Sequence, residues 1–331
     1  MRLLFKWVLI SSSLILFGLF LYERCSRIYL AKKYAPPGQL VDIGNRHLHL
    51  HCQGTGRVTV ILEDGLGPAG SLAWVKVKPG VASFTRVCTY DRAGIMWSDP
   101  SPHSPTPTQV AKDLHMALEQ ADIQSPYILV GASMGGIYIR TFAEYYPDEV
   151  VGVVLVDSAH PAQEDRFPPS PVNLEPSVVN LWLTRQYAAM GILRLSHHLP
   201  NRNVKRIPSQ ILNQLKAFAP QSIRAVQSES QSFGSSLECA QSLQSLGDRP
   251  LIVLTAAKAR SVDQLPSGFT EEYLFQQGVV WQELQAELAT LSSESQQIIS
   301  EESSHLMYFD QPDLIVDAVR NVLNQVMLSN P

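Results

Sequence analysis

Apolar residues along the chain fall into short runs that alternate with segments of helical spacing. Short apolar runs and polar–apolar alternation are typical of strands, and they occur at residues 46–52, 58–65, 85–92, 126–132, 150–157 and 250–256. Apolar residues at helical spacing predict helices at residues 106–121, 135–147 and 311–326. Strands that alternate with helices predict an α/β fold, in which a mostly parallel sheet is covered by helices on both faces.

Residues 161–247 interrupt this alternation, because they contain helical patterns at 177–199, 208–219 and 222–232 and no run that predicts a strand. The segment therefore predicts a helical cap inserted between two strands of the sheet. Apolar cap residues could line an acyl pocket, although such a stripe more often packs one helix on its neighbours. They include Leu181, Trp182, Leu183, Met190, Ile192 and Leu193.

The N-terminal segment contains a long apolar stretch. No charged residue falls between Lys6 and Glu23, and about twenty residues counted from Leu3 would span about 30 Å as a helix, the thickness of a membrane core. A cleaved signal peptide is the competing interpretation, but the bulky sequence LYERC stands where small residues should form the cleavage site. The pattern favours a retained single-pass anchor and a membrane localisation.

The predicted organisation has three parts. Residues 1–33 form the anchor and a basic juxtamembrane segment, and YAPPG at the start of the next part is typical of a stiff linker. Residues 34–160 and 248–331 form the core, and 161–247 form the cap. More basic residues follow the apolar stretch than precede it, which favours a cytoplasmic core only weakly and leaves the side of the membrane open.

Composition excludes few functions. The chain has 331 residues, 45% of them hydrophobic, and a net charge of −4, so it does not have the basic character of a nucleic-acid-binding protein. Its four cysteines are too few for a disulfide framework in a chain of this length and do not settle its compartment.

The motif GASMGG at residues 131–136 carries the first candidate for chemistry. It contains the pattern G-x-S-x-G, and it lies between a predicted buried strand and a predicted helix. A sharp turn from strand to helix strains the serine and leaves no room for larger neighbours than glycine. The alternative is an ordinary tight turn with a capping serine, but the context favours Ser133 as a nucleophile.

A serine nucleophile needs a base, and His305 is the candidate. It lies downstream of the serine, in SSHLMYFDQPDL just before the last predicted helix. His160 lies at the start of the cap, where it could line the mouth of a pocket. The other histidines are less suitable, and the alternating ones on strand 46–52 more often lie on a solvated face than bind a metal. They are His47, His49, His51, His103, His115, His197 and His198.

Together these motifs resemble the α/β-hydrolase superfamily over about residues 36–331. VILEDGLGPAGSLAW resembles its oxyanion loop, YDRAGIMWSD its D-x-x-G-x-G-x-S turn, and the serine and histidine motifs match its elbow and histidine loop. Met96 replaces the second glycine of the turn, and Glu63-Asp64 replaces the usual His-Gly of the oxyanion loop. The resemblance implies an eight-stranded, mostly parallel sheet, a helical cap, and ester or amide hydrolysis without a metal or cofactor.

The acid of the triad is the less certain member. The superfamily most often places it after the strand at 250–256, but Lys258, Ala259 and Arg260 stand there and Asp263 comes late. Asp157, at the end of the preceding strand, is the alternative used by some members. Chain geometry favours Asp157.

Two backbone N–H groups are predicted to hold an oxyanion. Met134 follows the serine at a helix N-terminus, and Leu66 lies in the Gly-rich loop after strand 58–65. The strand order of the superfamily would also place Cys52 beside Cys88, which makes a disulfide between them possible.

The sequence therefore predicts a membrane-anchored serine hydrolase that cleaves a carboxylic ester or a related acyl bond. Its partner would be a small acyl substrate, which could be a lipid. The alternatives are a peptidase of the same superfamily and a membrane-tethered binding protein that keeps the fold without catalysis. Substrate identity and oligomeric state do not follow from the sequence.

Overall fold

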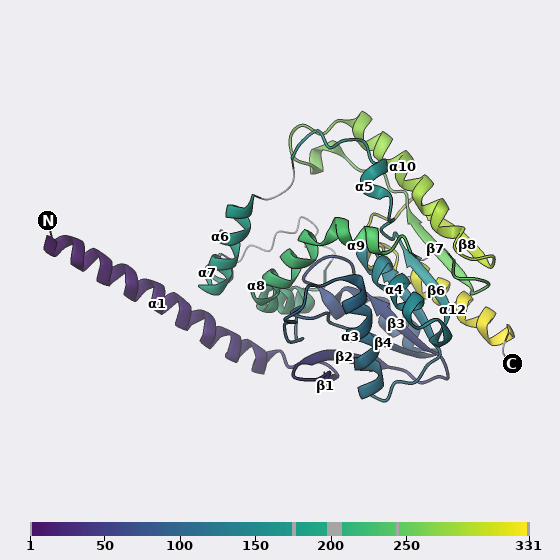
Figure 1. The fold of residues 1–331 in the computed structure, drawn as a ribbon, viewed down its shortest axis with the longest axis horizontal. Coiled ribbons are helices and arrows are strands. Elements are labelled where there is room, and N and C mark those ends of the chain that lie inside the picture. The colour runs from purple at the N-terminus through teal and green to yellow at the C-terminus, as the bar shows by residue number, and fades with distance from the viewer. Residues whose placement is uncertain (1, 174–176, 197–206, 243–244, 330–331) are drawn as a thin grey trace.

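The sheet has eight strands, and the computed structural model describes residues 2–173, 177–196, 207–242 and 245–329 (Figure 1). The strand order is β1-β2-β4-β3-β5-β6-β7-β8. Pairs β1–β2 and β2–β4 are antiparallel, and all other neighbours are parallel. The strands are β1 (Gln39–Asp42), β2 (His47–Gln53), β3 (Thr59–Glu63), β4 (Arg86–Tyr90), β5 (Tyr127–Ala132), β6 (Val150–Val156), β7 (Leu251–Ala256) and β8 (Ser295–Ser300).

Helices cover both faces of this sheet, as the alternating pattern predicts. Side chains from α3 (Pro107–Gln120), α4 (Met134–Tyr145) and α10 (Glu271–Ala289) join the core on one face. The other face is covered by α2 (Lys78–Ala82) and α12 (Pro312–Ser329). The central strands are buried throughout, because apolar side chains on both of their faces meet a helical layer.

The described chain between β6 and β7 consists of helices joined by loops, without a named strand. It contains α5 (Gln163–Arg166), α6 (Val178–Ala189), α7 (Ile192–Leu195), α8 (Ser209–Gln231) and α9 (Phe233–Cys239). We call this segment the cap. The six apolar cap residues named above are neither fully buried nor uniformly exposed, and Trp182 keeps 57% of its surface in solvent.

The predicted helices of the cap differ from the observed ones. The segment predicted as one helix at 177–199 breaks at Gly191, which adopts a left-handed conformation with φ 70° and so ends α6. The two helices predicted at 208–219 and 222–232 are instead the single helix α8, which contains Pro220. A proline has no backbone N–H, so one hydrogen bond of the helix is lost. Here the packing of the apolar face of α8 on the core outweighs that loss.

Several elements have no prediction of their own in the sequence pattern, and two strands and one long helix are among them. These are β1, α10 and β8. β8 is an edge strand with the sequence SQQIIS, so most of its side chains remain in contact with solvent and no apolar run marks it.

The N-terminal helix α1 (Arg2–Lys33) has two contrasting halves. Figure 1 shows its N-terminal half projecting away from the body of the molecule. The helix is long and apolar enough to cross a membrane, judged by length and composition. Its second half instead packs on the cap, where the buried Glu23 binds Arg194 of α7 at 2.8 Å and Arg27 at 2.7 Å.

The segment predicted as a linker is held by the core. Trp97 donates its ring N–H to the Tyr34 carbonyl (2.9 Å), and a ring nitrogen of His49 lies 2.6 Å from the Pro37 carbonyl oxygen. The expectation that the β2 histidines face solvent is wrong for His49. It is fully buried and binds Asp91 at 2.8 Å, and the Trp97 ring and the Pro37 carbonyl lie against its ring.

The expected cysteine pairing is present. Cys52 of β2 lies directly opposite Cys88 of β4, and a disulfide joins them. The bond ties together the antiparallel pair at one side of the sheet.

Candidate active site

Ser133 lies at a sharp turn between β5 and α4. Its φ of 52° is in the left-handed region, which is unfavourable for a residue with a side chain. Hydrogen bonds hold this conformation: the serine N–H donates to the Val156 carbonyl (3.1 Å), and its carbonyl accepts from Gly136 (3.0 Å) and Ala159 (2.9 Å). The turn is therefore fixed by its neighbours.

The glycines of the motif are required by close packing. A Cβ at Gly131 would lie 2.6 Å from the Gly135 carbonyl oxygen, and one at Gly135 would lie 2.5 Å from the Glu63 carbonyl oxygen. A Cβ at Gly136 would lie 1.8 Å from Ser158 Oγ. Each of these contacts is shorter than van der Waals packing allows, so the turn tolerates no side chain at the three positions.

Asp157 follows β6 and lies beside this turn. It is 2% exposed and, like the serine, has a positive φ, here 42°. Its Oδ1 accepts from the Ala256 N–H (2.9 Å) and from the indole N–H of Trp281 (2.8 Å). Its Oδ2 lies 2.5 Å from Nδ1 of His305. Two fixed donors thus aim the carboxylate at one imidazole nitrogen.

His305 lies in the loop between β8 and α11 (Met307–Asp310), and its side chain is 51% exposed. Removal from water lowers the pKa of the ring, but the hydrogen bond and the negative charge of Asp157 raise it by more. The nearby positive charge of Arg260 opposes that rise, and the net pKa is above the usual 6.5. The Trp281 ring also packs edge-on against the imidazole, at 6.3 Å between centroids.

The structure joins Asp157 to His305 but does not join His305 to the serine. Within the described ranges, neither the Ser133 hydroxyl nor Nε2 of His305 has a hydrogen-bond partner. The loops that carry the three residues all leave the carboxyl ends of parallel strands, which lie at the same edge of the sheet. A serine–histidine hydrogen bond often forms only with substrate bound.

The loop after β3 approaches the serine closely. A Cβ at Gly65 would lie 3.0 Å from Ser133 Cβ. The next residue, Leu66, keeps 39% of its surface exposed. In the described part of the chain, the backbone N–H groups of Leu66 and Met134 donate to no protein acceptor. The Met134 N–H lies at the positive end of the α4 dipole.

A buried ion cluster supports that loop, and the sequence pattern does not identify it. Arg92 binds Glu63 Oε1 at 2.6 Å and the two carboxylate oxygens of Glu229 at 2.7 and 2.9 Å. The same guanidinium donates to the carbonyls of Asp64 and Gly65, both at 2.8 Å. Arg92 therefore connects the loop beside the serine to helix α8 of the cap.

The cluster accounts for the departure from the family pattern at residue 63. Glu63 is buried and also accepts a hydrogen bond from the Tyr90 hydroxyl. Burial raises the pKa of Glu63 to about 7, although Arg92 and Tyr90 oppose the rise. The acidic side chain is present here because it pairs with an arginine that comes from the next loop of the sheet.

The remaining candidates make other contacts. Asp263 lies on a short 3₁₀ turn, is exposed, and its N–H contacts the Ser261 hydroxyl at 3.3 Å. His160 lies 3.6 Å from Glu287 of α10, and burial together with the charge of Arg140 lowers its pKa to about 4. His115 stacks on Tyr146. His197 and His198 lie outside the described residues.

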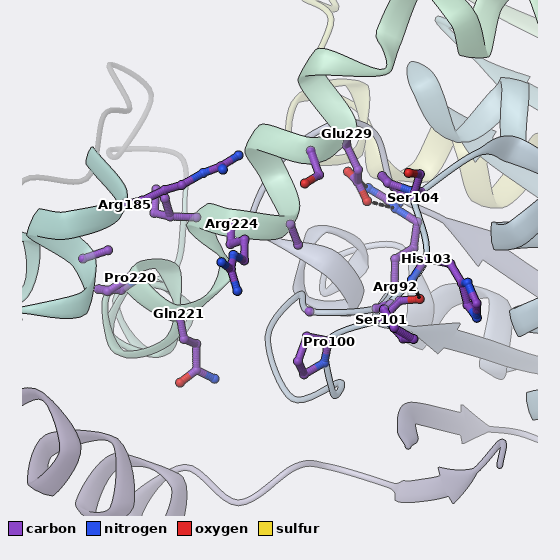
Figure 2. Close-up of a pocket in the computed structure, with 18 of the residues that line it drawn as sticks. Arg92, Pro100, Ser101, His103, Ser104, Arg185, Pro220, Gln221, Arg224 and Glu229 are labelled. Carbon is purple, nitrogen blue, oxygen red and sulfur yellow. Dashed lines mark hydrogen bonds and ion pairs between the residues drawn. The ribbon is translucent and has the colours of Figure 1, made fainter. Parts of the chain in front are cut away.

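A separate cavity of about 1090 Å³ lies between α1, the cap and the loop of residues 100–105, and Figure 2 shows residues that line it. Neither Ser133 nor Asp157 nor His305 is among its lining residues. A search of the described residues finds no group of three or more His, Cys, Asp and Glu side chains placed to hold a metal ion.

Comparison with known proteins identifies the fold by sequence. Residues 58–245 match the family model described as the alpha/beta hydrolase fold. The chain is 35% identical to a probable transporter of Hormonema carpetanum over 137 residues. The matched region covers 39% of this chain and 20% of that protein. It is 33% identical over 104 residues to an uncharacterised vacuolar membrane protein of Saccharomyces cerevisiae, covering 30% of this chain and 16% of that one. The matched region is thus a small part of each relative.

Solved structures agree on the fold. A thermophilic esterase from Thermogutta terrifontis aligns with a TM-score of 0.55 and 19% identity over 87% of this chain and 97% of its own. A serine hydrolase involved in carbazole degradation aligns with a TM-score of 0.58 and 16% identity, over 87% of this chain and 98% of its own. At these identities the similarity establishes the architecture alone.

Proposed function

The chain belongs to the α/β-hydrolase fold family, and from that premise we propose that it is a serine hydrolase that cleaves a carboxylic ester. One observation carries the proposal. The buried Asp157 carboxylate holds the imidazole of His305 at the edge of the sheet where the strained Ser133 lies. A nucleophile, a base and an acid that orients the base are the three roles that acyl transfer requires.

The proposed reaction uses the protein's own groups. Asp157 accepts a hydrogen bond from the Nδ1–H of His305, so Nε2 is left to take the Ser133 proton. The serine oxygen attacks the ester carbonyl, and the N–H groups of Leu66 and Met134 bind the oxyanion. The protonated Nε2 then gives its proton to the departing alcohol. Water, activated by the same nitrogen, hydrolyses the acyl-enzyme and releases the acid.

The proposal includes a membrane location. The apolar half of α1 supports a single-pass anchor, and the similarity to a vacuolar membrane protein agrees with it. An enzyme held at a bilayer meets lipids and other apolar esters at high local concentration. We therefore propose a small acyl substrate that can be lipidic.

A non-catalytic binding protein is the second candidate, because the serine and histidine side chains are not hydrogen-bonded to each other. A fluorophosphonate probe separates the two candidates. The full chain in detergent should be labelled at Ser133, because the probe reacts with an activated serine hydroxyl. Ser133→Ala should abolish labelling and ester hydrolysis together, with an unchanged melting temperature. Folded wild-type protein that takes no label would contradict the proposal and favour the binding protein.

A further inference from the structure

The cavity between α1 and the cap has an unusual lining. Figure 2 shows Arg185, Arg224 and Glu229 projecting from cap helices on one side, and the loop from Pro100 to Ser104 on the other. The second half of α1 forms another wall. The basic residues of the lining are Arg24, Arg27, Arg92, Arg185, Arg224 and His103.

Three of these arginines have no carboxylate partner in the part of the chain that the structure describes. Arg185 donates only to the neutral side-chain oxygens of Gln227 (2.6 Å) and Gln231 (3.4 Å). Arg24 lies over the Phe20 ring at 5.1 Å, and among the described residues neither it nor Arg224 forms an ion pair.

The acids that line the cavity are already paired. Glu229 is bound by Arg92, and Asp113 by Arg46. Glu23 is shared by Arg27 and Arg194. The cavity therefore has an uncompensated positive charge.

The same cavity has an apolar side. Phe20 of α1 and Trp182 of α6 line it, and Trp182 is 57% exposed. Nearby on the cap, Val178, Val179 and Leu195 are also exposed, at 81%, 64% and 50%. A surface of large apolar side chains beside a basic pocket fits a ligand with an anionic head and an apolar tail.

The position of the cavity along α1 matches a membrane surface. Phe20 and Arg24 flank the point where the apolar stretch of the helix ends. Figure 1 shows α7 beside the middle of α1, where Arg194 binds Glu23 and the free half of the helix leaves the body of the molecule. If that half crosses a bilayer, the cavity lies at the level of the lipid headgroups.

We propose that this cavity binds an anionic, phosphate-bearing membrane lipid. Arg24, Arg185 and Arg224 hold the phosphate, because guanidinium groups bind phosphate oxygens in paired, charge-assisted hydrogen bonds. The acyl chains lie against Phe20 and Trp182. The inference rests on the membrane placement of α1 proposed above, and it does not depend on hydrolysis at Ser133.

The test measures binding without turnover. The full chain with Ser133→Ala, in neutral detergent, is titrated with dioctanoyl phosphatidic acid, and binding is followed by calorimetry. We expect saturable binding that dioctanoyl phosphatidylcholine does not reproduce. The further change of Arg224→Gln together with Arg24→Gln should weaken it at least about tenfold, since two charge-assisted contacts are lost.

The controls separate the alternatives. Arg57→Gln, an exposed arginine on the loop between β2 and β3, should leave binding unchanged. Arg224→Gln alone changes an exposed side chain, so it reports on the site even if the double variant unfolds. Equal binding of phosphatidylcholine, or no loss in the single and double variants, would overturn the proposal. Displacement by millimolar inorganic phosphate would assign the site to free phosphate instead of lipid. Fluorophosphonate labelling of the Ser133-containing chain reports separately on the hydrolase.

Discussion

At the scale of single residues, the site depends on two strained positions. Ser133 and Asp157 both have positive φ, and both follow neighbouring strands of the sheet. Such backbone conformations are unfavourable for residues with side chains and persist only where the surroundings enforce them. Both positions follow the carboxyl ends of parallel strands, so the hydroxyl and the carboxylate lie at one edge of the sheet, and the carboxylate contacts the imidazole of His305.

The first prediction concerns the acid. Asp157→Asn should lower kcat by about 10⁴, because the amide keeps the shape of the side chain but favours the wrong tautomer of His305. Asp263→Asn is the matched control and should leave kcat unchanged, since that side chain contacts Ser261 and not the imidazole. Steady-state hydrolysis of a chromogenic ester by the two purified variants measures both. Equal losses would show that Asp157 does not orient the base.

The second prediction concerns pH. His305 accepts the serine proton only when its ring is neutral, so kcat/KM should rise with pH as the ring loses its proton. Because Asp157 raises the pKa of the ring, the midpoint should lie above 6.5. In any residual activity of Asp157→Asn the midpoint should move to lower pH, since the raising charge is gone. A midpoint that is the same in both proteins would assign the titration to another group.

At the scale of elements, Arg92 connects the loop after β3 to helix α8. A guanidinium with two carboxylates and two carbonyls around it is satisfied only when all of these elements are in place. Removing one carboxylate leaves the other to compensate the guanidinium, but it removes buried charge-assisted hydrogen bonds, and that costs more than an exposed ion pair contributes. The cap and the loop beside the serine are therefore coupled through one side chain.

The third prediction tests this coupling. Glu229→Gln should lower the free energy of unfolding by about 1–3 kcal/mol, because the buried Arg92 loses charge-assisted hydrogen bonds while Glu63 still compensates its charge. The loop that presents the Leu66 N–H loses support in the same step, so kcat should fall as well. Glu238→Gln on α9 is an exposed control. Chemical denaturation and ester hydrolysis measure the two effects, and a variant as stable and active as the control would contradict the coupling.

At the scale of the whole molecule, α1 is part of the fold as well as a candidate anchor. Glu23 is 1% exposed and binds Arg194, which comes from the cap far along the chain. Gly191 lies close enough that a Cβ there would be 2.9 Å from the Tyr22 ring. The cap is thus positioned by the same helix that would place the protein at a bilayer.

The fourth prediction follows from that contact. Glu23→Ala should loosen α7 from α1, because Arg194 loses its carboxylate in a site where its side chain is 8% exposed. Limited trypsin digestion of the full chain in detergent should then cut at Arg194 faster than in the wild type. Lys32→Ala, an exposed change on the same helix, should leave the rate unchanged. Equal cleavage rates in the two variants would show that the ion pair does not hold the cap.

The sequence by itself determined the features that depend on local patterns of residues, namely the fold class and the serine motif. Alternating apolar runs predicted the α/β class, because apolar residues recur along each strand or helix with the period of the face that the element buries. G-x-S-x-G identified Ser133. The glycines at 131, 135 and 136 are needed because a Cβ at any of them would clash with atoms of the same turn or of its immediate neighbours. The sequence pattern does not predict the edge strand β8, because a partly solvated strand has no apolar run.

Only the tertiary structure determined the contacts between residues far apart in the sequence, because these contacts depend on which elements pack together. No spacing in the sequence indicates that Trp281 donates to Asp157, that Arg92 binds Glu229, or that Glu23 meets Arg194. These pairs are separated by 124, 137 and 171 positions. A buried charge requires a partner, but the sequence does not show where along the chain that partner lies. Only the packing of the sheet, the cap and α1 identifies the partner.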